Sequence, residues 1–296
     1  MKSLSSTRIV TRQFLSAALL LLSASLTACA PTCKLGACAT QAVARFATSE
    51  GFTTQLVEGK GFQHQVSWRT KGTPTAVLWV FIEGDGKPWS DDSQTINDDP
   101  SPRSTLAFQL AGQTDGAVLY LGRPCYFSAR SDTRCSKEIW SSDRFSNDVV
   151  VSMNEALRAM IAQLQSKRAI LVGHSGGGTL AALMASDLIA ADSPPAALVT
   201  IAGNLDVEAW TSHHGYLPLT GSRNPAREAP LPATVPQFHL IGVKDTNVTV
   251  DMNARYFARV ADTSVWRESR FDHSCCWALD WPHFRRRIER ALPANQ

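Results

Sequence analysis

The pentapeptide Gly-His-Ser-Gly-Gly at residues 173–177, together with the segments beside it, restricts the fold more than any other feature of this 296-residue chain. The apolar residues 169–172 come directly before it and predict a strand buried on both faces. Large apolar side chains recur three and four apart over residues 180–189 and predict a helix after it. A strand that turns sharply into a helix leaves room only for glycine where the two meet. Ser175 would then project its hydroxyl from the carboxyl edge of the sheet.

Strand patterns recur along the rest of the chain. Residues 52–58 and 62–69 alternate in polarity on either side of Gly-Lys-Gly and predict a β-hairpin. Continuous apolar runs predict further strands, each buried on both faces. These runs are residues 76–82, 117–121, 169–172, 196–201 and 238–241.

Helical patterns lie between the strands. The clearest runs from Phe145 to Leu164, with apolar residues three and four apart along one face. Pro282 is expected in the first turn of a last helix, which carries Phe284 and Ile288 and ends near Pro293. Strands that alternate with helices predict an α/β fold, in which helices cover both faces of a mostly parallel sheet.

The chain divides into few parts. Residues 29–50 lack a clear apolar period and are expected to be a tether. Residues 51–296 contain no linker or internal repeat and are expected to form one domain. Within it, residues of about 206–236 combine weak periodicity with several prolines, and we expect a small cap over the site there.

A serine hydroxyl is a weak nucleophile near neutral pH, so it needs a base, and the base needs an acid that orients it. Asp245 comes just after the strand at 238–241, and His273 follows a short strand predicted at 265–268. Both would therefore reach the sheet edge at which Ser175 lies. The sequence predicts Ser175, Asp245 and His273 as a catalytic triad, with Asp206, which follows the strand at 196–201, as the alternative acid.

Other polar residues are weaker candidates. Asp272 adjoins His273, and adjacent side chains usually diverge. His239 lies inside an apolar strand and is expected to be a hydrogen-bonded core histidine. His213 and His214 are expected to be a solvated pair in a loop.

At this point the chain resembles the α/β-hydrolase superfamily over essentially all of residues 51–296. Four segments also make it similar to a group of bacterial lipoprotein hydrolases: Ile-Glu-Gly-Asp-Gly at 82–86, Leu-Gly-Arg-Pro-Cys at 121–125, the glycine-rich residues 173–178, and His-Ser-Cys-Cys-Trp at 273–277. The resemblance implies an α/β-hydrolase fold and hydrolysis of carboxylic esters through an acyl-enzyme intermediate, without a metal or another cofactor. A small-molecule acyl compound would be the substrate.

The resemblance also implies an oxyanion hole formed by the backbone amides of Gly176 and Asp85. Many members of the superfamily have His-Gly where this chain has Glu83 and Gly84. An acidic side chain at Asp85 is unfavourable beside a developing negative charge, so we expect it to point away or to bind a cationic part of the substrate. Peptidase, amidase and thioesterase activities with the same triad stay open, as does a non-catalytic envelope binding protein of this fold.

The first 28 residues have the features of an export signal. Three basic residues precede a short apolar run that begins at Phe14, and no acidic residue is present. The run is too short to span a bilayer comfortably. Leu-Thr-Ala-Cys at 26–29 resembles the lipobox of bacterial lipoproteins, which implies cleavage before Cys29 and acylation of that residue. Ala30 stands where an aspartate would favour inner-membrane retention in the enterobacterial pattern, so we expect a lipid anchor in the outer membrane of a bacterial envelope, facing the periplasm.

Six of the seven cysteines remain after Cys29, an even number in a chain expected to reach an oxidising compartment. Cys125 and Cys135 bracket one predicted loop and are the favoured disulfide. Cys275 and Cys276 are further candidates, bridged to each other or to that loop. With His273 they could also bind zinc, but no second ligand pair at metal-site spacing stands out, so no metal is expected.

The charge of the chain argues against nucleic acid as a partner. Lysine and arginine number 29 against 26 acidic residues, and three of the bases lie in the first 28 residues. The remaining chain is therefore neutral and has no excess of positive charge that would attract a phosphate backbone.

Overall fold

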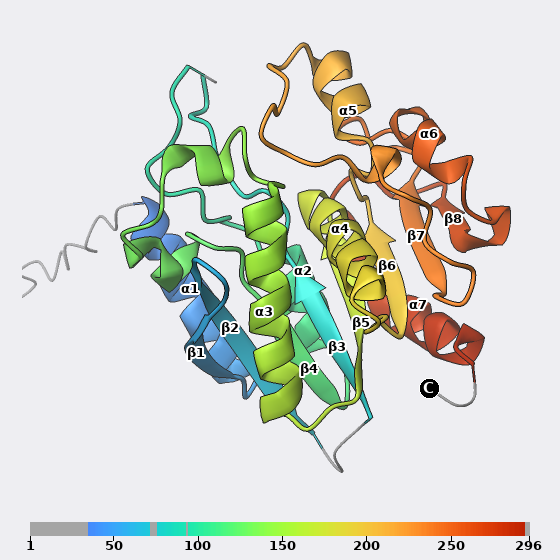
Figure 1. Ribbon diagram of the computed structural model, residues 1–296, viewed down its shortest axis with the longest axis horizontal. Coiled ribbons are helices and arrows are strands. Elements are labelled where there is room, and N and C mark those ends of the chain that lie inside the picture. The colour runs from blue at the N-terminus through green and yellow to red at the C-terminus, as the bar shows by residue number, and fades with distance from the viewer. Residues whose placement is uncertain (1–34, 72–75, 93, 294–296) are drawn as a thin grey trace, which may run out of the picture. The chain divides into compact units, whose positions relative to one another are not determined.

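A mixed sheet is the framework of the protein in the computed structural model, which describes residues 35–71, 76–92 and 94–293 (Figure 1). Its strands within those residues are β1 (Thr53–Glu58), β2 (Gln63–Thr70), β3 (Val77–Ile82), β4 (Ala117–Leu121), β5 (Arg168–His174), β6 (Ala197–Ile201), β7 (Gln237–Gly242) and β8 (Val265–Glu268). Their order across the sheet is β1-β2-β4-β3-β5-β6-β7-β8. The β1–β2 and β2–β4 pairs are antiparallel and the other pairs are parallel. The expected hairpin and mostly parallel sheet are therefore confirmed.

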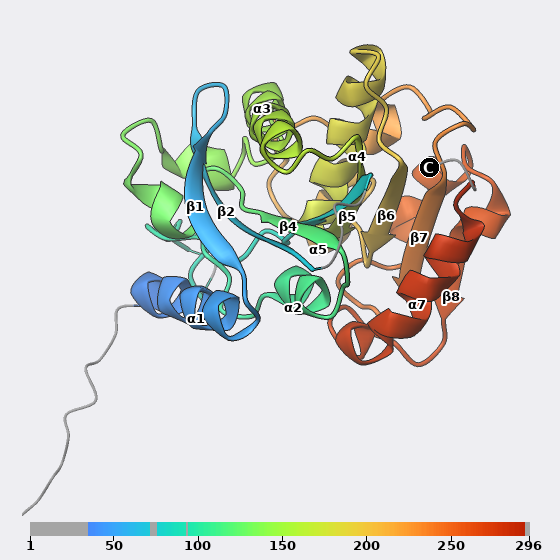
Figure 2. The same ribbon diagram turned by 90° about the horizontal axis from the view of Figure 1, so that it is seen from below.

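Helices cover both faces of the sheet (Figure 2). On one side lie α1 (Leu35–Ser49), α2 (Leu106–Gly112) and α7 (Trp277–Ala291), and on the other α3 (Asn147–Gln163), α4 (Gly176–Ala190) and α6 (Ala254–Phe257). The helix α5 (Val207–His214) lies beyond the carboxyl ends of the strands (Figure 1). Short 3₁₀ helices occur at Phe127–Ser131, Lys137–Trp140, Pro225–Arg227, Asp251–Asn253 and Asp262–Ser264.

The central strand β3 shows why the two faces each bury a core. Trp79 and Phe81 pack with the helices α2 and α7, while Leu78, Val80 and Ile82 pack with α3 and α4. Successive side chains of a strand point to opposite faces. A strand that is apolar at every position therefore fits only between two helical layers.

The expected tether at residues 29–50 is instead the helix α1 from Leu35 onward. Its buried residues Ala39, Val43 and Ala47 are spaced four apart, and the ring of Phe46 lies 4.9 Å from that of Phe108. The helical period is present in the sequence but is carried mainly by alanine, so the apolar signal is weak. The expected signal segment and Cys29 lie outside the described residues, and no helix within those residues is long and apolar enough to cross a bilayer.

The last helix begins earlier than expected. Pro282 is not in the first turn of α7 but at its sixth residue, inside the helix. Trp277 and Trp281, one turn apart, are both fully buried in the core. Burial of these two large side chains stabilises the extra N-terminal turn. This gain offsets the loss of the one backbone hydrogen bond that Pro282 cannot donate.

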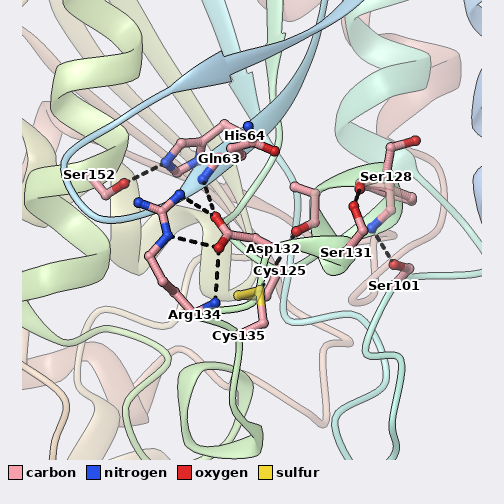
Figure 3. Close-up of a disulfide and its surroundings, with 12 residues drawn as sticks. Gln63, His64, Ser101, Cys125, Ser128, Ser131, Asp132, Arg134, Cys135 and Ser152 are labelled. Atoms are coloured by element: carbon pink, nitrogen blue, oxygen red, sulfur yellow. Dashed lines mark hydrogen bonds and ion pairs between the residues drawn. A yellow bond between two sulfur atoms is a disulfide. The ribbon is translucent and has the colours of Figure 1, made fainter.

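The loop after β4 is closed by a disulfide between Cys125 and Cys135, the pair favoured by the sequence (Figure 3). Inside this loop Asp132 accepts hydrogen bonds from the Arg134 side chain and from the backbone amide of Gln63 in β2, at 3.0 Å. The bonds from Arg134 lower the pKa of Asp132 to about 2. The loop is thus stabilised by contacts within it and by a hydrogen bond to the sheet.

Candidate active site

Ser175 occupies the turn between β5 and α4 with φ 53° and ψ −123°, a left-handed conformation that a non-glycine residue rarely adopts. The neighbouring glycines make this turn possible. A Cβ atom on Gly173 would lie 2.1 Å from the carbonyl oxygen of Gly177, and one on Gly177 would lie 2.3 Å from that of Ile82. Side chains at either position would push the strand and the helix apart, so the local structure is that of a nucleophile elbow.

The three residues predicted as a triad lie in contact. The Nε2 atom of His273 is 3.0 Å from the hydroxyl oxygen of Ser175, and its Nδ1 atom is 2.8 Å from Oδ2 of Asp245. The Asp245 carboxylate is buried, and its other oxygen accepts hydrogen bonds from the backbone amides of Asn247 and Val248 at 2.8 and 2.9 Å. An acid held in this way fixes both the tautomer and the orientation of the imidazole ring.

Asp206, the alternative acid, has a different role. Its side chain caps the first turn of α5 by accepting the backbone amide of Ala209, and it binds the side chains of Asn224 at 2.9 Å and Arg255 at 3.0 Å. Asp272 likewise accepts backbone amides from the two residues that follow His273. The structure therefore brings Asp245, and neither of the other two carboxylates, to His273.

The other histidines are placed as follows. His239 is buried and bonds the hydroxyl of Thr200 at 2.8 Å, as expected of a core histidine, and burial lowers its pKa to about 3. The expectation of a solvated loop pair at His213 and His214 is right only in part, since His213 is exposed but neither residue lies in a loop. Both residues end α5, and the Nε2 atom of His214 lies 2.8 Å from the backbone oxygen of Asn247.

The Asp85 carboxylate binds cationic groups of the protein itself, so it is not free for a cationic part of the substrate. It forms ion pairs with two buried arginines, at 2.5 Å to Arg123 and 2.9 Å to Arg144. Burial by itself raises the pKa of Asp85, but the two guanidinium groups outweigh it and hold the pKa below its ordinary value. The hydroxyl of Tyr126 donates to the Asp85 backbone oxygen at 2.8 Å, so both the side chain and the backbone of this residue are fixed.

Gly176 lies directly against this cluster. A Cβ atom at Gly176 would be 1.9 Å from Oδ1 of Asp85. The two residues expected to supply the oxyanion donors, Gly176 and Asp85, belong to different motifs but are neighbours in space.

Several functional contacts were not expected from the sequence. Arg123 belongs to a motif that we singled out, but nothing in the sequence pairs it with Asp85, 38 residues away, and Arg144 is 59 residues from Asp85. Asn247 was also missed, although its side chain lies 3.1 Å from His273 Nε2. Glu83, which replaces the common histidine, accepts the backbone amide of Ala107 in the first turn of α2 at 3.1 Å.

Cys275 and Cys276 are bonded to each other. Their sulfur atoms are therefore not available as zinc ligands. Within the part of the chain that the structure describes, no cluster of histidine, cysteine and carboxylate side chains could hold a metal ion.

Comparisons with known proteins agree with this fold. The model of the alpha/beta hydrolase family matches residues 98–293, and the chain belongs to that family. A bacterial membrane phospholipase A is 15% identical, with a TM-score of 0.54 over 85% of this chain and 90% of its own. An esterase from Pyrococcus furiosus is 12% identical, with a TM-score of 0.56 over 82% and 91% of the two chains.

A serine hydrolase without a lid, from Xanthomonas campestris, is also 12% identical, with a TM-score of 0.51 over 82% of this chain and 96% of its own. Comparison with curated protein sequences finds no match. At such low identities the solved structures show a shared fold. The family match over residues 98–293 places the protein among the alpha/beta hydrolases.

Proposed function

We propose that the protein is a serine hydrolase that cleaves carboxylic esters through an acyl-enzyme intermediate. The observation that carries the proposal is the continuous contact from Ser175 Oγ through His273 to the buried carboxylate of Asp245. A hydroxyl, an imidazole and a carboxylate in this order are the parts that nucleophilic acyl transfer requires.

In the first half of the reaction Ser175 Oγ attacks the ester carbonyl carbon while His273 Nε2 takes its proton. The C–O bond to the alcohol then breaks, and His273 returns the proton to the leaving oxygen. In the second half water attacks the acyl-enzyme by the same route, and Ser175 is released with its proton. Asp245 stabilises the imidazolium form of His273 in both halves.

The backbone amides of Gly176 and Asp85 form the proposed oxyanion hole. Gly176 is the first residue of α4, where the helix dipole and the free amides favour a negative charge. Two arginines face one carboxylate at Asp85, so its amide lies beside a net positive charge. Removal of one oxyanion donor typically lowers the rate by about 100- to 1,000-fold.

The names of the structural neighbours support this choice of chemistry, since they include an esterase, a phospholipase and a serine hydrolase. The test uses a fluorophosphonate probe, which labels an activated serine. Wild type should be labelled at Ser175 and should hydrolyse acyl esters of graded chain length, whereas Ser175→Ala should do neither. Labelling of another serine in the variant would refute the assignment, and faster hydrolysis of matched amides than of esters would replace esterase by amidase activity.

We also propose that Cys29 carries acyl chains that anchor the enzyme to a membrane of the bacterial envelope. The support is the lipobox-like Leu-Thr-Ala-Cys at residues 26–29 behind a basic and then apolar segment. Several acyl chains hold a protein on a bilayer far more firmly than one.

A further inference from the structure

Asn247 connects the catalytic histidine with the expected cap. Its backbone amide donates to Asp245 and its backbone oxygen faces His214. Its side-chain oxygen lies 3.3 Å from the indole nitrogen of Trp210 in α5, and its side-chain nitrogen lies 3.1 Å from His273 Nε2. Four contacts therefore fix this one residue between the cap and the triad.

Trp210 determines which end of the Asn247 amide faces the histidine. An indole N–H can only donate a hydrogen bond, so the atom of Asn247 that faces it must be the oxygen. The NH₂ group then points at His273. The Trp210 ring is itself packed against those of His214 and Tyr216, at centroid distances of 5.5 and 5.1 Å.

The NH₂ group of Asn247 shares its acceptor with the nucleophile. When Nδ1 of His273 donates to Asp245, Nε2 has a single lone pair. Both the hydroxyl of Ser175, at 3.0 Å, and the NH₂ of Asn247, at 3.1 Å, are aimed at that lone pair. Once Nε2 has taken the serine proton it can no longer accept, and Asn247 needs another acceptor in the same place.

The leaving atom of the substrate is the acceptor that the reaction brings there, because His273 Nε2 must reach it to return the proton. In the tetrahedral intermediate an ester oxygen has two lone pairs. One takes the proton from His273, and the other stays free for the NH₂ of Asn247. An amide nitrogen has only one lone pair, which the proton uses, and a thioester sulfur is a weak acceptor.

We propose that Asn247 donates a hydrogen bond to the leaving oxygen and thereby makes the site selective for oxygen esters over thioesters and amides. This inference rests on the proposed function, since it requires Ser175 and His273 in their catalytic roles. The electron pair of the breaking C–O bond goes to the leaving oxygen, the proton comes from His273 Nε2, and Asn247 transfers nothing. It acts only as a fixed donor.

The test compares an ethyl ester and an S-ethyl thioester of the acyl group that wild type hydrolyses fastest. The quantity is kcat/KM, which reports on acylation and therefore on departure of the leaving group. Asn247→Leu keeps the approximate volume and removes the donor. It should lower kcat/KM for the ester by about 10- to 100-fold and for the thioester by less than about threefold, because one hydrogen bond to an atom that gains charge is lost for the ester alone.

Trp210→Phe is the second variant, because it keeps a ring in the cap but frees the Asn247 amide to turn. Like Asn247→Leu, it should lower the ester-to-thioester ratio of kcat/KM, but by a smaller factor. Thr246→Ala is the matched control, since this exposed neighbour in the same loop should leave the ester-to-thioester ratio unchanged.

The outcomes separate this inference from the proposed function. Fluorophosphonate labelling of Ser175 in wild type and in Asn247→Leu shows that the nucleophile is intact. If Asn247→Leu lowers kcat/KM by the same factor for the ester and the thioester, the role of Asn247 is structural and the inference is overturned. An unchanged kcat/KM for the ester would overturn it as well. Absence of labelling at Ser175 in wild type would instead refute the proposed function.

Discussion

Asp85 combines two roles in one residue, a backbone amide aimed at the proposed oxyanion and a carboxylate that binds two arginines. Asp85→Asn keeps the amide and the shape but leaves Arg123 and Arg144 buried without a negative partner. Loss of one member of a buried charge cluster typically costs about 3–5 kcal/mol, so we expect the free energy of unfolding to fall by about 3 kcal/mol. Urea unfolding followed by circular dichroism measures it. A change below about 1 kcal/mol would mean that the arginines find other partners.

Single residues also show how much of the candidate site can be predicted from the sequence. Ser175, Asp245 and His273 were predicted correctly as neighbours, because each follows a strand and parallel strands end at the same edge. Asn247 and the arginine pair were not, because side-chain pairing across distant segments leaves no periodic pattern. Of the two alternatives given for Asp85, binding a cationic part of the substrate is wrong for the same reason, because Arg123 and Arg144 occupy the carboxylate.

Among the elements, the strands β3 to β8 and the two longest internal helices were predicted because their buried positions hold large apolar residues. The strands β1 and β2 were predicted from the alternating residues on either side of Gly-Lys-Gly. The helix α2 was missed, since its seven residues are too few for a period to emerge. The N-terminal turn of α7 was missed because the sequence pattern places Pro282 in the first turn of the helix. The helix begins earlier because Trp277 and Trp281 are buried in the core, and this tertiary contact leaves no local pattern in the sequence.

The contact between β2 and α3 leads to a prediction about pH. His64 in β2 is buried and bonds the hydroxyl of Ser152 in α3 at 2.8 Å (Figure 3). Its other ring nitrogen lies 2.9 Å from the backbone oxygen of Gly122. Burial lowers its pKa from 6.5 to about 4. Between pH 6.5 and 4, His64 is therefore protonated in the unfolded chain but neutral in the folded protein. The stability contributed by neutral His64 is complete above pH 6.5 and is lost as the pH falls towards 4.

The variant His64→Gln stays neutral and tests this linkage. Between pH 6.5 and 4.5 the free energy of unfolding of wild type should fall by about 2 kcal/mol more than that of the variant, since each pH unit in this window corresponds to about 1.4 kcal/mol. Urea unfolding at a series of pH values measures both slopes. Parallel slopes would show that His64 is protonated in the folded protein as readily as in the unfolded chain.

At the scale of the whole molecule, the proposed anchor determines where the enzyme can meet its substrate. Without its first 28 residues the chain has equal numbers of acidic and basic residues, so charge alone would not hold it on an anionic bilayer. Acylation of Cys29 would have to supply the attachment. Cys29→Ala should therefore abolish incorporation of labelled palmitate and processing by signal peptidase II. Most of the protein should also move from the membrane fraction to the soluble envelope fraction if the signal segment is still cleaved.

The matched control is Gln41→Ala, which changes an exposed residue of α1 but leaves residues 26–29 intact. It should keep the palmitate label and the membrane location. Activity on a soluble ester, measured in detergent, should be equal for wild type and Cys29→Ala, because Ser175, Asp245 and His273 all lie in the described domain. If Cys29→Ala still incorporates palmitate, or stays on the membrane after normal cleavage, the anchor lies elsewhere in the chain.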